Sequence, residues 1–213
     1  MAGAPVSGAR EEMLARVRGA LEGAPADPPF ERAYRRESGE PQELLIARFA
    51  ERVGEYRAEV VRVPGAGVAE AAAAAFAEHA AARVVVPPDL PHDWRPEGIE
   101  IVEDHGLSPA ELDAVDGVMT GCAVAIAETG TFVLDGGAAQ GRRALTLVPD
   151  LHVCVVGADQ IAALVPEALE RVARRRSPVT LVSGPSATSD IELERVEGVH
   201  GPRRLHVLIA EWV

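Results

Sequence analysis

Two short polar segments contain most of the side chains that could bind a small anion or take part in catalysis. The first is Glu128-Thr-Gly-Thr131 and the second is Ser183-Gly-Pro-Ser-Ala-Thr-Ser-Asp190. Each follows an apolar run that predicts a strand, at 122–127 and at 179–182. Hydroxyl and backbone N–H groups at a strand end suit a carboxylate or phosphate. We therefore expect the two segments to line one polar site, with their side chains within about 10 Å of each other.

The candidate residues divide into one catalytic candidate and a set of ligand-binding groups. Glu128 could act as a base or a nucleophilic carboxylate, or it could be a turn residue that caps backbone amides. Asp190 could instead be an N-cap, and His200 a loop anchor. Arg142 or Arg143 could supply charge-assisted hydrogen bonds to an anion. The candidate ligand-binding residues are Thr129, Gly130, Thr131, Arg142, Ser183, Gly184, Ser186, Thr188, Asp190 and His200.

Short apolar strands alternate with helices along most of the chain, and this order positions the polar segments. It predicts an α/β fold with an open, mixed and mostly parallel sheet, flanking helices, and one antiparallel excursion within 122–134. The hydroxyl-rich segment after 179–182 is expected to lead into a return strand. Strands are predicted at 56–63, 83–86, 99–102, 122–127, 131–134, 152–156, 179–182 and 205–210. Helices are predicted at 8–22, 41–54, 69–82, from 108, and at 159–174 with an irregularity at Pro166.

A connector at 23–41, rich in Pro, Gly and charged residues, is the one plausible domain boundary. We therefore predict that residues 1–40 form an N-terminal helix and its connector. Residues 41–213 are predicted to form the α/β domain. This makes the first helix an arm rather than part of the main core.

Composition and charge exclude several classes of function. All 21 basic residues are Arg, so neither a Schiff-base lysine nor a P-loop is present. The net charge of −12 disfavours nucleic acid as a partner. No apolar run approaches the roughly 20 residues of a membrane span, and the N-terminus shows no secretory signal. We expect a cytoplasmic protein.

The sequence predicts no metal site and no cofactor. Cys122 and Cys154 both lie in apolar runs, which predicts buried, reduced thiols rather than a disulfide. Two Cys are too few for an iron–sulfur cluster, which needs about four thiolates. Gly65-Ala-Gly67 lacks the third Gly of a dinucleotide-binding turn. The six His residues are scattered along the chain, without the spacing of a metal motif.

Four motifs in order carry a resemblance to a known family. They are Gly121-Cys-Ala-Val-Ala-Ile-Ala-Glu-Thr-Gly-Thr131, Leu147-Val-Pro149 with His152, Ser183 to Ile191, and Gly198-Val-His-Gly-Pro202. Together they resemble the lactate utilisation protein C family (LutC/YkgG-like, LUD domain) over roughly residues 41–211.

The resemblance implies both a fold and a function. The implied fold is similar to the sugar-isomerase, ribose-5-phosphate isomerase and CoA-transferase-like group. The implied function is an accessory role in L-lactate utilisation, beside iron–sulfur partner proteins that oxidise lactate to pyruvate. Two alternatives stay open. One is an isomerase or CoA-transferase-like enzyme that uses Glu128, and the other is a purely structural assembly subunit.

Overall fold

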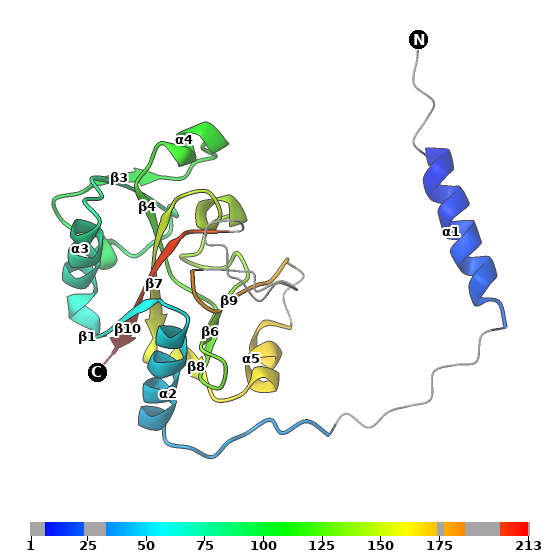
Figure 1. Cartoon of the computed structure of the whole chain (residues 1–213), viewed down its shortest axis with the longest axis horizontal. Helices are drawn as coiled ribbons and strands as arrows, with labels where there is room; N and C mark the ends of the chain where they lie inside the picture. Colours follow the sequence, from blue (N-terminus) through cyan, green and yellow to red (C-terminus); the bar gives the residue numbers. More distant parts are fainter. Residues whose placement is uncertain (1–6, 24–32, 174–176, 186–200, 213) are drawn as a thin grey trace, which may run out of the picture. The chain divides into compact units, whose positions relative to one another are not determined.

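The computed structural model describes residues 7–23, 33–173, 177–185 and 201–212. The chain divides into two compact units, residues 1–34 and 35–213. In the first unit, α1 (Ser7–Leu21) confirms the predicted N-terminal helix (Figure 1). Of its larger apolar side chains, Met13, Val17 and Leu21 are exposed and Leu14 is half-buried.

The second unit is built on a six-stranded sheet in which every strand is parallel to its neighbours. The strand order is β1-β10-β7-β4-β2-β3. The central strands β4 and β7 are fully buried, as expected of a parallel sheet covered on both faces. The six strands of this sheet are β1 (Glu59–Pro64), β2 (Arg83–Val86), β3 (Glu100–Glu103), β4 (Gly117–Thr120), β7 (Leu151–Gly157) and β10 (Arg204–Glu211).

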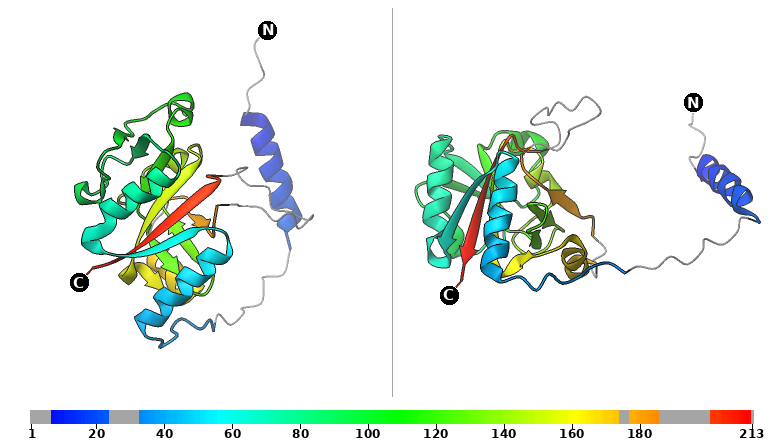
Figure 2. Two further views of the ribbon diagram at one scale, coloured as in Figure 1. Left: turned by 60° about the vertical axis from the view of Figure 1, so that its left-hand side comes forward. Right: turned by 60° about the horizontal axis from the view of Figure 1, so that its bottom comes forward.

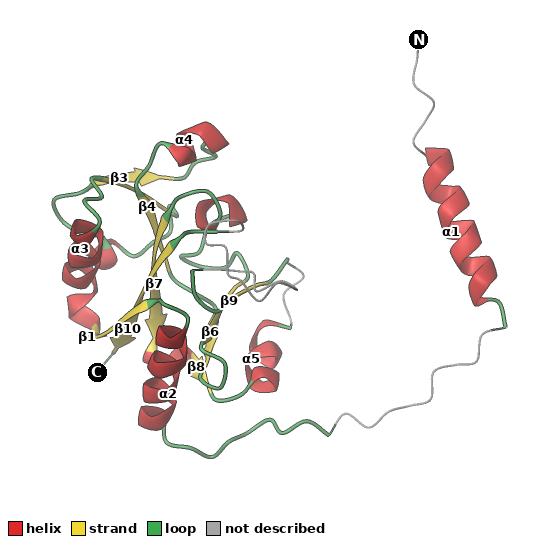
Figure 3. Ribbon diagram, viewed as in Figure 1, coloured by secondary structure: helices red, strands yellow, loops and turns green. Residues whose placement is uncertain are grey.

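A second, four-stranded sheet has the order β8-β5-β6-β9. Its strands β6, β8 and β9 are labelled in Figure 3. Here β5 (Val124–Ile126) and β6 (Thr131–Leu134) form the predicted antiparallel pair. The other two strands are β8 (Ile161–Ala162), parallel to β5, and β9 (Thr180–Val182), antiparallel to β6. The α/β fold is confirmed, but it contains one parallel and one small mixed sheet instead of a single mixed sheet. The predicted return strand is β10, which pairs with β1 and β7 and leaves β9 to pair with β6.

Two helices cover opposite faces of the larger sheet (Figure 2). The buried side of α2 (Gln42–Glu55) packs in a cluster with Leu205, Val207 and Ile209 of β10. The buried side of α3 (Val68–Glu78) packs with Leu208 and Ala210, which alternate with them along the strand. The smaller sheet shares the α2 side, because Phe132 of β6 belongs to the same cluster.

The shorter helices bear out one sequence prediction and correct another. Ser108 and Glu111 form the predicted capping box at the start of α4 (Pro109–Asp113). The predicted helix at 159–174 is wrong in its first part, because Ile161 and Ala162 are buried and pair with β5 as β8. The helix is α5 (Val165–Val172), and Pro166 lies in its first turn, where a missing N–H costs nothing. None of the helices in the described ranges has the length and apolar character needed to cross a bilayer.

Removal of residues 1–24 should leave the α/β domain intact. The connector is rich in Pro and Gly, and Met13, Val17 and Leu21 of α1 are exposed, so little buried surface should be lost. We expect the melting temperature to change by less than about 2 °C, measured by circular dichroism on the truncated and full-length proteins. Aggregation of the truncated chain, or a much larger decrease, would show that α1 packs into the main core.

Candidate functional site

The two polar segments meet through their hydroxyl groups. Antiparallel pairing of β6 with β9 places Thr131 beside Ser183, and their hydroxyl oxygens lie 2.6 Å apart. The Thr129 hydroxyl lies 2.7 Å from that of Thr131 on the other side. The expectation that the segments lie within 10 Å is therefore confirmed for these residues. We call Thr129, Thr131 and Ser183 the hydroxyl cluster.

The number of hydroxyl protons limits how many hydrogen bonds the hydroxyl cluster can donate to a ligand. Three hydroxyls carry three protons, and the two mutual hydrogen bonds use two of them. The third proton can go to the Thr129 carbonyl oxygen, 3.5 Å from the Thr131 hydroxyl, or to an outside acceptor. Thr131 is buried, while Thr129 and Ser183 are half-buried. The outer hydroxyls can therefore reach a small polar molecule, and Thr131 fixes their positions.

Two glycines allow these loops to pack closely against the C-terminal end of α2. Gly130 has φ +60°, and a Cβ there would lie 2.6 Å from backbone atoms of Arg52 and Val53. Gly184 has φ +110°, and its Cβ would lie 2.4 Å from the Cβ of Tyr56. Both positions need the left-handed backbone and the missing side chain of glycine. The end of α2 therefore fixes the positions of both loops.

Glu128 lies at the solvent-facing edge of the first loop. Its side chain is 48% exposed, and its carboxylate lies 3.8 Å from the guanidinium of Arg35. The backbone N–H of Glu128 donates to the carbonyl oxygen of Ala163, which fixes the main chain. Glu128 also contributes to the raised pKa of Arg48, after the larger effect of its partner Glu40. An accessible carboxylate of this kind is compatible with a base or nucleophile and equally with a surface ion pair.

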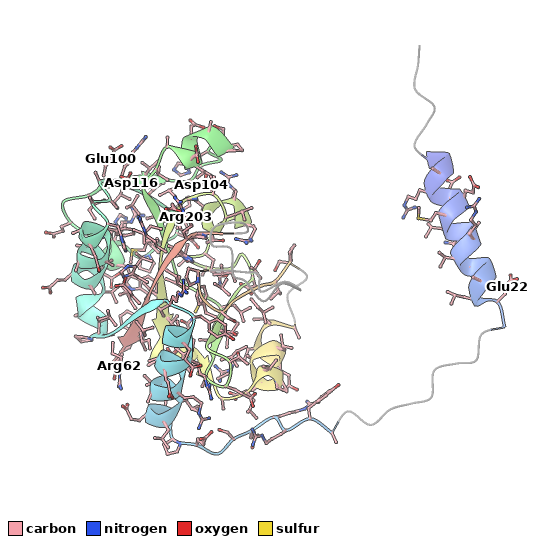
Figure 4. The ribbon with its side chains drawn as sticks, in the orientation of Figure 1. Glu22, Arg62, Glu100, Asp104, Asp116 and Arg203 are labelled. Atoms are coloured by element: carbon pink, nitrogen blue, oxygen red, sulfur yellow. The ribbon has the colours of Figure 1, made fainter. Side chains whose placement is uncertain are left out.

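Arg142 lies apart from the hydroxyl cluster. Its guanidinium forms two hydrogen bonds, of 2.6 and 2.9 Å, with the buried carboxylate of Asp104. These bonds are the main cause that holds the pKa of Asp104 below its ordinary value. Asp104 follows β3, which is one edge strand of the larger sheet (Figure 4). The helix α2 packs against β1, the strand at the other edge. Among the described residues, Arg142 therefore pairs with Asp104 and not with the hydroxyl cluster, and its role in ligand binding stays a prediction.

His152 is a buried polar residue that is not among the site candidates predicted from the sequence. Its Nε2 lies 2.8 Å from the hydroxyl of Thr120, and its ring packs edge-on against Phe132, which follows Thr131. Burial, and secondly the charge of Arg143, lower the pKa of His152 to about 3. Its imidazole is therefore neutral at physiological pH. The signal that could have found it was its place in the family motif.

Of Arg142 and Arg143, it is Arg143 whose charge acts on the buried His152. Its guanidinium donates to the carbonyl and hydroxyl oxygens of Thr146, at 2.7 and 2.9 Å. Partial burial lowers the pKa of Arg143, although much of the side chain remains exposed. Of the two arginines predicted to meet an anion, Arg143 is therefore the one beside His152.

Both cysteines are buried and free, as the sequence predicted. Burial, followed by the neighbouring Cys122 thiol, raises the pKa of the Cys154 thiol well above its ordinary value. A thiol in this state is a poor nucleophile and a poor metal ligand, since both roles need the thiolate. Ser186, Thr188, Asp190 and His200 lie outside the described residues, so their part in the site stays a prediction.

Comparison with known proteins identifies the family. Residues 109–210 match the LUD domain. The chain is 46% identical to the lactate utilization protein C of Deinococcus radiodurans, over 94% of this chain and 95% of that protein. The chain belongs to the lactate utilization protein C family. A homologue of the same name from Geobacillus kaustophilus is 26% identical over 81% of this chain and 80% of its own length.

The fold of this family member is also similar to a solved structure. A DUF162 family protein of Deinococcus radiodurans superposes with a TM-score of 0.71 at 42% identity, covering 80% of this chain and 99% of that one. The resemblance drawn from the four motifs is therefore confirmed. The family name assigns no residue to a chemical role, so the site rests on the geometry described above.

Replacing Gly130 with alanine should destabilise the protein more than the same change at Gly136. Both glycines have positive φ, +60° and +68°, so both variants incur the cost of a left-handed alanine. Only at Gly130 does the new Cβ collide with backbone atoms of α2, whereas its nearest neighbour at Gly136 is 3.8 Å away. Urea unfolding should give a difference of at least about 1 kcal/mol between the variants. Equal losses would show that α2 does not constrain this loop.

His152 should make stability depend on pH in the mildly acidic range. The unfolded chain takes up a proton on this residue below its ordinary pKa of 6.5, whereas the folded chain does so only near 3. Stability is therefore lost as pH falls from about 6.5 towards 3, by up to about 1.4 kcal/mol per pH unit.

The test compares unfolding free energies of the wild type and His152→Gln between pH 7 and pH 4. The slope should be shallower in the variant, because the titrating group is gone. His206, whose pKa is also lowered, contributes equally to both curves and cancels. Identical slopes would contradict the assignment.

Proposed function

We propose that this chain is an accessory component of L-lactate utilisation that acts beside iron–sulfur proteins oxidising L-lactate to pyruvate. The observation that carries this proposal is the 46% identity, across almost the whole chain, to a relative named for lactate utilization. Two buried cysteines cannot supply the roughly four thiolates of an iron–sulfur cluster, so the redox step falls to partner proteins. Free thiols also suit a reducing compartment, which supports a cytoplasmic location.

We further propose that the hydroxyl cluster is the core of a pocket for a small polar molecule or anion. The half-buried hydroxyls of Thr129 and Ser183 are held in place by the buried Thr131. Arg143 is close enough to His152 for its charge to affect the pKa of that histidine. A carboxylate or phosphate would accept a hydrogen bond from the one hydroxyl proton that the mutual hydrogen bonds leave free, and would face a cation. The sequence neighbours Ser186, Thr188, Asp190 and His200 belong to this proposal, as do Gly130 and Gly184, which bring the loops together.

The accessible carboxylate of Glu128 favours one alternative, that the chain is itself an enzyme. Glu128 adjoins the hydroxyl cluster in sequence and is half exposed, so it could act as a base or form a covalent acyl intermediate. The proposed similarity to the sugar-isomerase, ribose-5-phosphate isomerase and CoA-transferase-like fold supports this alternative. The other alternative is a structural subunit whose loops only hold the sheets together.

A panel of variants separates the three functions. Each variant replaces the wild-type protein in its own host, and L-lactate oxidation is measured in permeabilised cells. Growth on pyruvate is the control for general fitness. We expect loss of the gene to abolish growth on L-lactate but not on pyruvate. We expect Thr131→Val with Ser183→Ala to lower L-lactate oxidation about tenfold or more, because a hydrogen bond to a charged ligand is worth about 1.5–3 kcal/mol and the buried Thr131 no longer fixes the outer hydroxyls.

Thr180→Val is the matched control, since Thr180 lies on the same strand, β9, but outside the hydroxyl cluster. It should retain the wild-type rate. A double variant with full activity would leave only the structural role. A Glu128→Gln variant that loses activity as fully as the double variant would favour the enzyme. Growth on L-lactate without the gene would contradict the proposed pathway itself.

A further inference from the structure

Three polar side chains from distant parts of the sequence meet on the α3 face of the larger sheet. His206 lies on β10, Glu59 begins the neighbouring strand β1, and His79 follows the end of α3. Glu59 is directly paired with His206 in the parallel register, so the two side chains point to the same face. The chain reverses after α3 with Ala80 in the left-handed region, and His79 thereby turns towards the sheet.

The geometry of this group is close to that of a metal-binding site. The Nε2 atoms of His79 and His206 lie 2.8 Å apart, and on the other side of the His206 ring its Nδ1 lies 3.6 Å from Oε2 of Glu59. Only one of these two His206 nitrogens would bind a given ion. One ligand atom from each of the three residues lies within 4.8 Å of the others. Ligands of a tetrahedral Zn²⁺, each bound at about 2.0–2.2 Å, are spaced about 3.3–3.6 Å apart. Small side-chain rotations would therefore bring all three to one ion.

We infer that Glu59, His79 and His206 form a binding site for a divalent transition-metal ion, and Zn²⁺ is the ion whose ligand preferences they match. Two imidazole nitrogens and one carboxylate are a frequent zinc set, and a water molecule completes the tetrahedron. Hard ions such as Mg²⁺ prefer oxygen ligands and are disfavoured by two imidazoles.

Burial and charge around the three residues support the inference. The His206 side chain is 3% exposed, while Glu59 is 52% exposed, so an ion could enter from the Glu59 side. The negative charges of Glu59 and Glu78 act on His206, and negative charge at this place favours a cation.

The site is separate from the proposed anion pocket. His206 faces α3, whereas His152 and Cys154 lie on strand positions that face α2 and the smaller sheet. A metal here would join β1, β10 and the end of α3 at the starting ends of the strands. Its role would be to stabilise the fold, because ligands of parallel sheets are usually held at the other end. The sequence predicted no metal because 127 residues separate the two histidines.

The experiment uses the full-length chain without a histidine tag, stripped of metal with a chelator. Zn²⁺ is titrated by competition with a chromophoric chelator, and Co²⁺ serves as a spectroscopic probe. The wild type should bind one equivalent of Zn²⁺ and give the intense visible bands of tetrahedral Co²⁺. His79→Gln and Glu59→Gln should each weaken Zn²⁺ binding by at least about tenfold. Neither residue is fully buried, so both variants should fold, which far-ultraviolet circular dichroism verifies.

His105→Ala is the matched control. His105 lies 3.2 Å from the carboxylate of Glu103 in an exposed pair and has no second histidine beside it in the described part of the chain. Its removal should leave Zn²⁺ affinity within about twofold of the wild type, because His105 is not one of the three proposed ligands. A wild type without a saturable site, or a His79→Gln variant that binds like the wild type, would overturn the inference. His79 and His206 would then be a hydrogen-bonded imidazole pair.

Discussion

Insertion of β10 between β1 and β7 is the interaction on which the rest of this structure depends. The strand comes from the C-terminal end of the chain, yet it pairs with Glu59–Pro64 along one side and with Leu151–Gly157 along the other. Its alternate side chains supply apolar surface to both faces of the sheet, for α2 on one and α3 on the other. Without β10 the larger sheet would be divided, and each helix would lose part of the surface that it covers. Such long-range pairing also carries a loop-closure cost, which grows only slowly with the length of the loop.

The candidate site depends on a second, smaller pairing. Because β10 has both neighbours in the larger sheet, β9 pairs with β6, and this antiparallel contact joins Thr131 to Ser183. The same small sheet lies over the buried His152 through Phe132. The end of α2 then fixes both loops through contacts that only glycine permits at Gly130 and Gly184. Hydroxyl groups held in place by strands and a helix end would lose less conformational entropy when they bind a small ligand.

Local features of the fold were predictable from the sequence, and the long-range ones were not. The capping box at Ser108, the helix that begins at Gln42 and the antiparallel pair around Gly130 follow from patterns within a few residues, and the structure confirms them. The two-residue strand β8 was missed because Ile161 and Ala162 also fit a helical pattern, and only pairing with β5 decides between them. The division into two sheets was missed for the same reason, since strand order is set by partners far away in sequence.

The site shows the same division between local and long-range information. The meeting of the two hydroxyl-rich segments was predictable, because both follow apolar strands. The separation of Arg142 from Arg143 was not, since adjacent residues differ only in whether Asp104 or Thr146 lies within reach. His79 and His206 carried no signal at all in the sequence, because nothing in either local pattern refers to the other.

The period of two residues along β-strands explains how this chain can hold two distinct polar groups within one core. On β10, Leu205 and Val207 face the side of the proposed anion pocket, and His206 between them faces the side of the proposed metal ion. The parallel register carries this separation to β7 and β1, so that Cys154 and Glu59 lie on opposite faces. A bound cation on the α3 face could therefore stabilise the strand pairing from the face opposite the hydroxyl cluster. The sheet lies between the two proposed sites, and β10 contributes side chains to both of its faces.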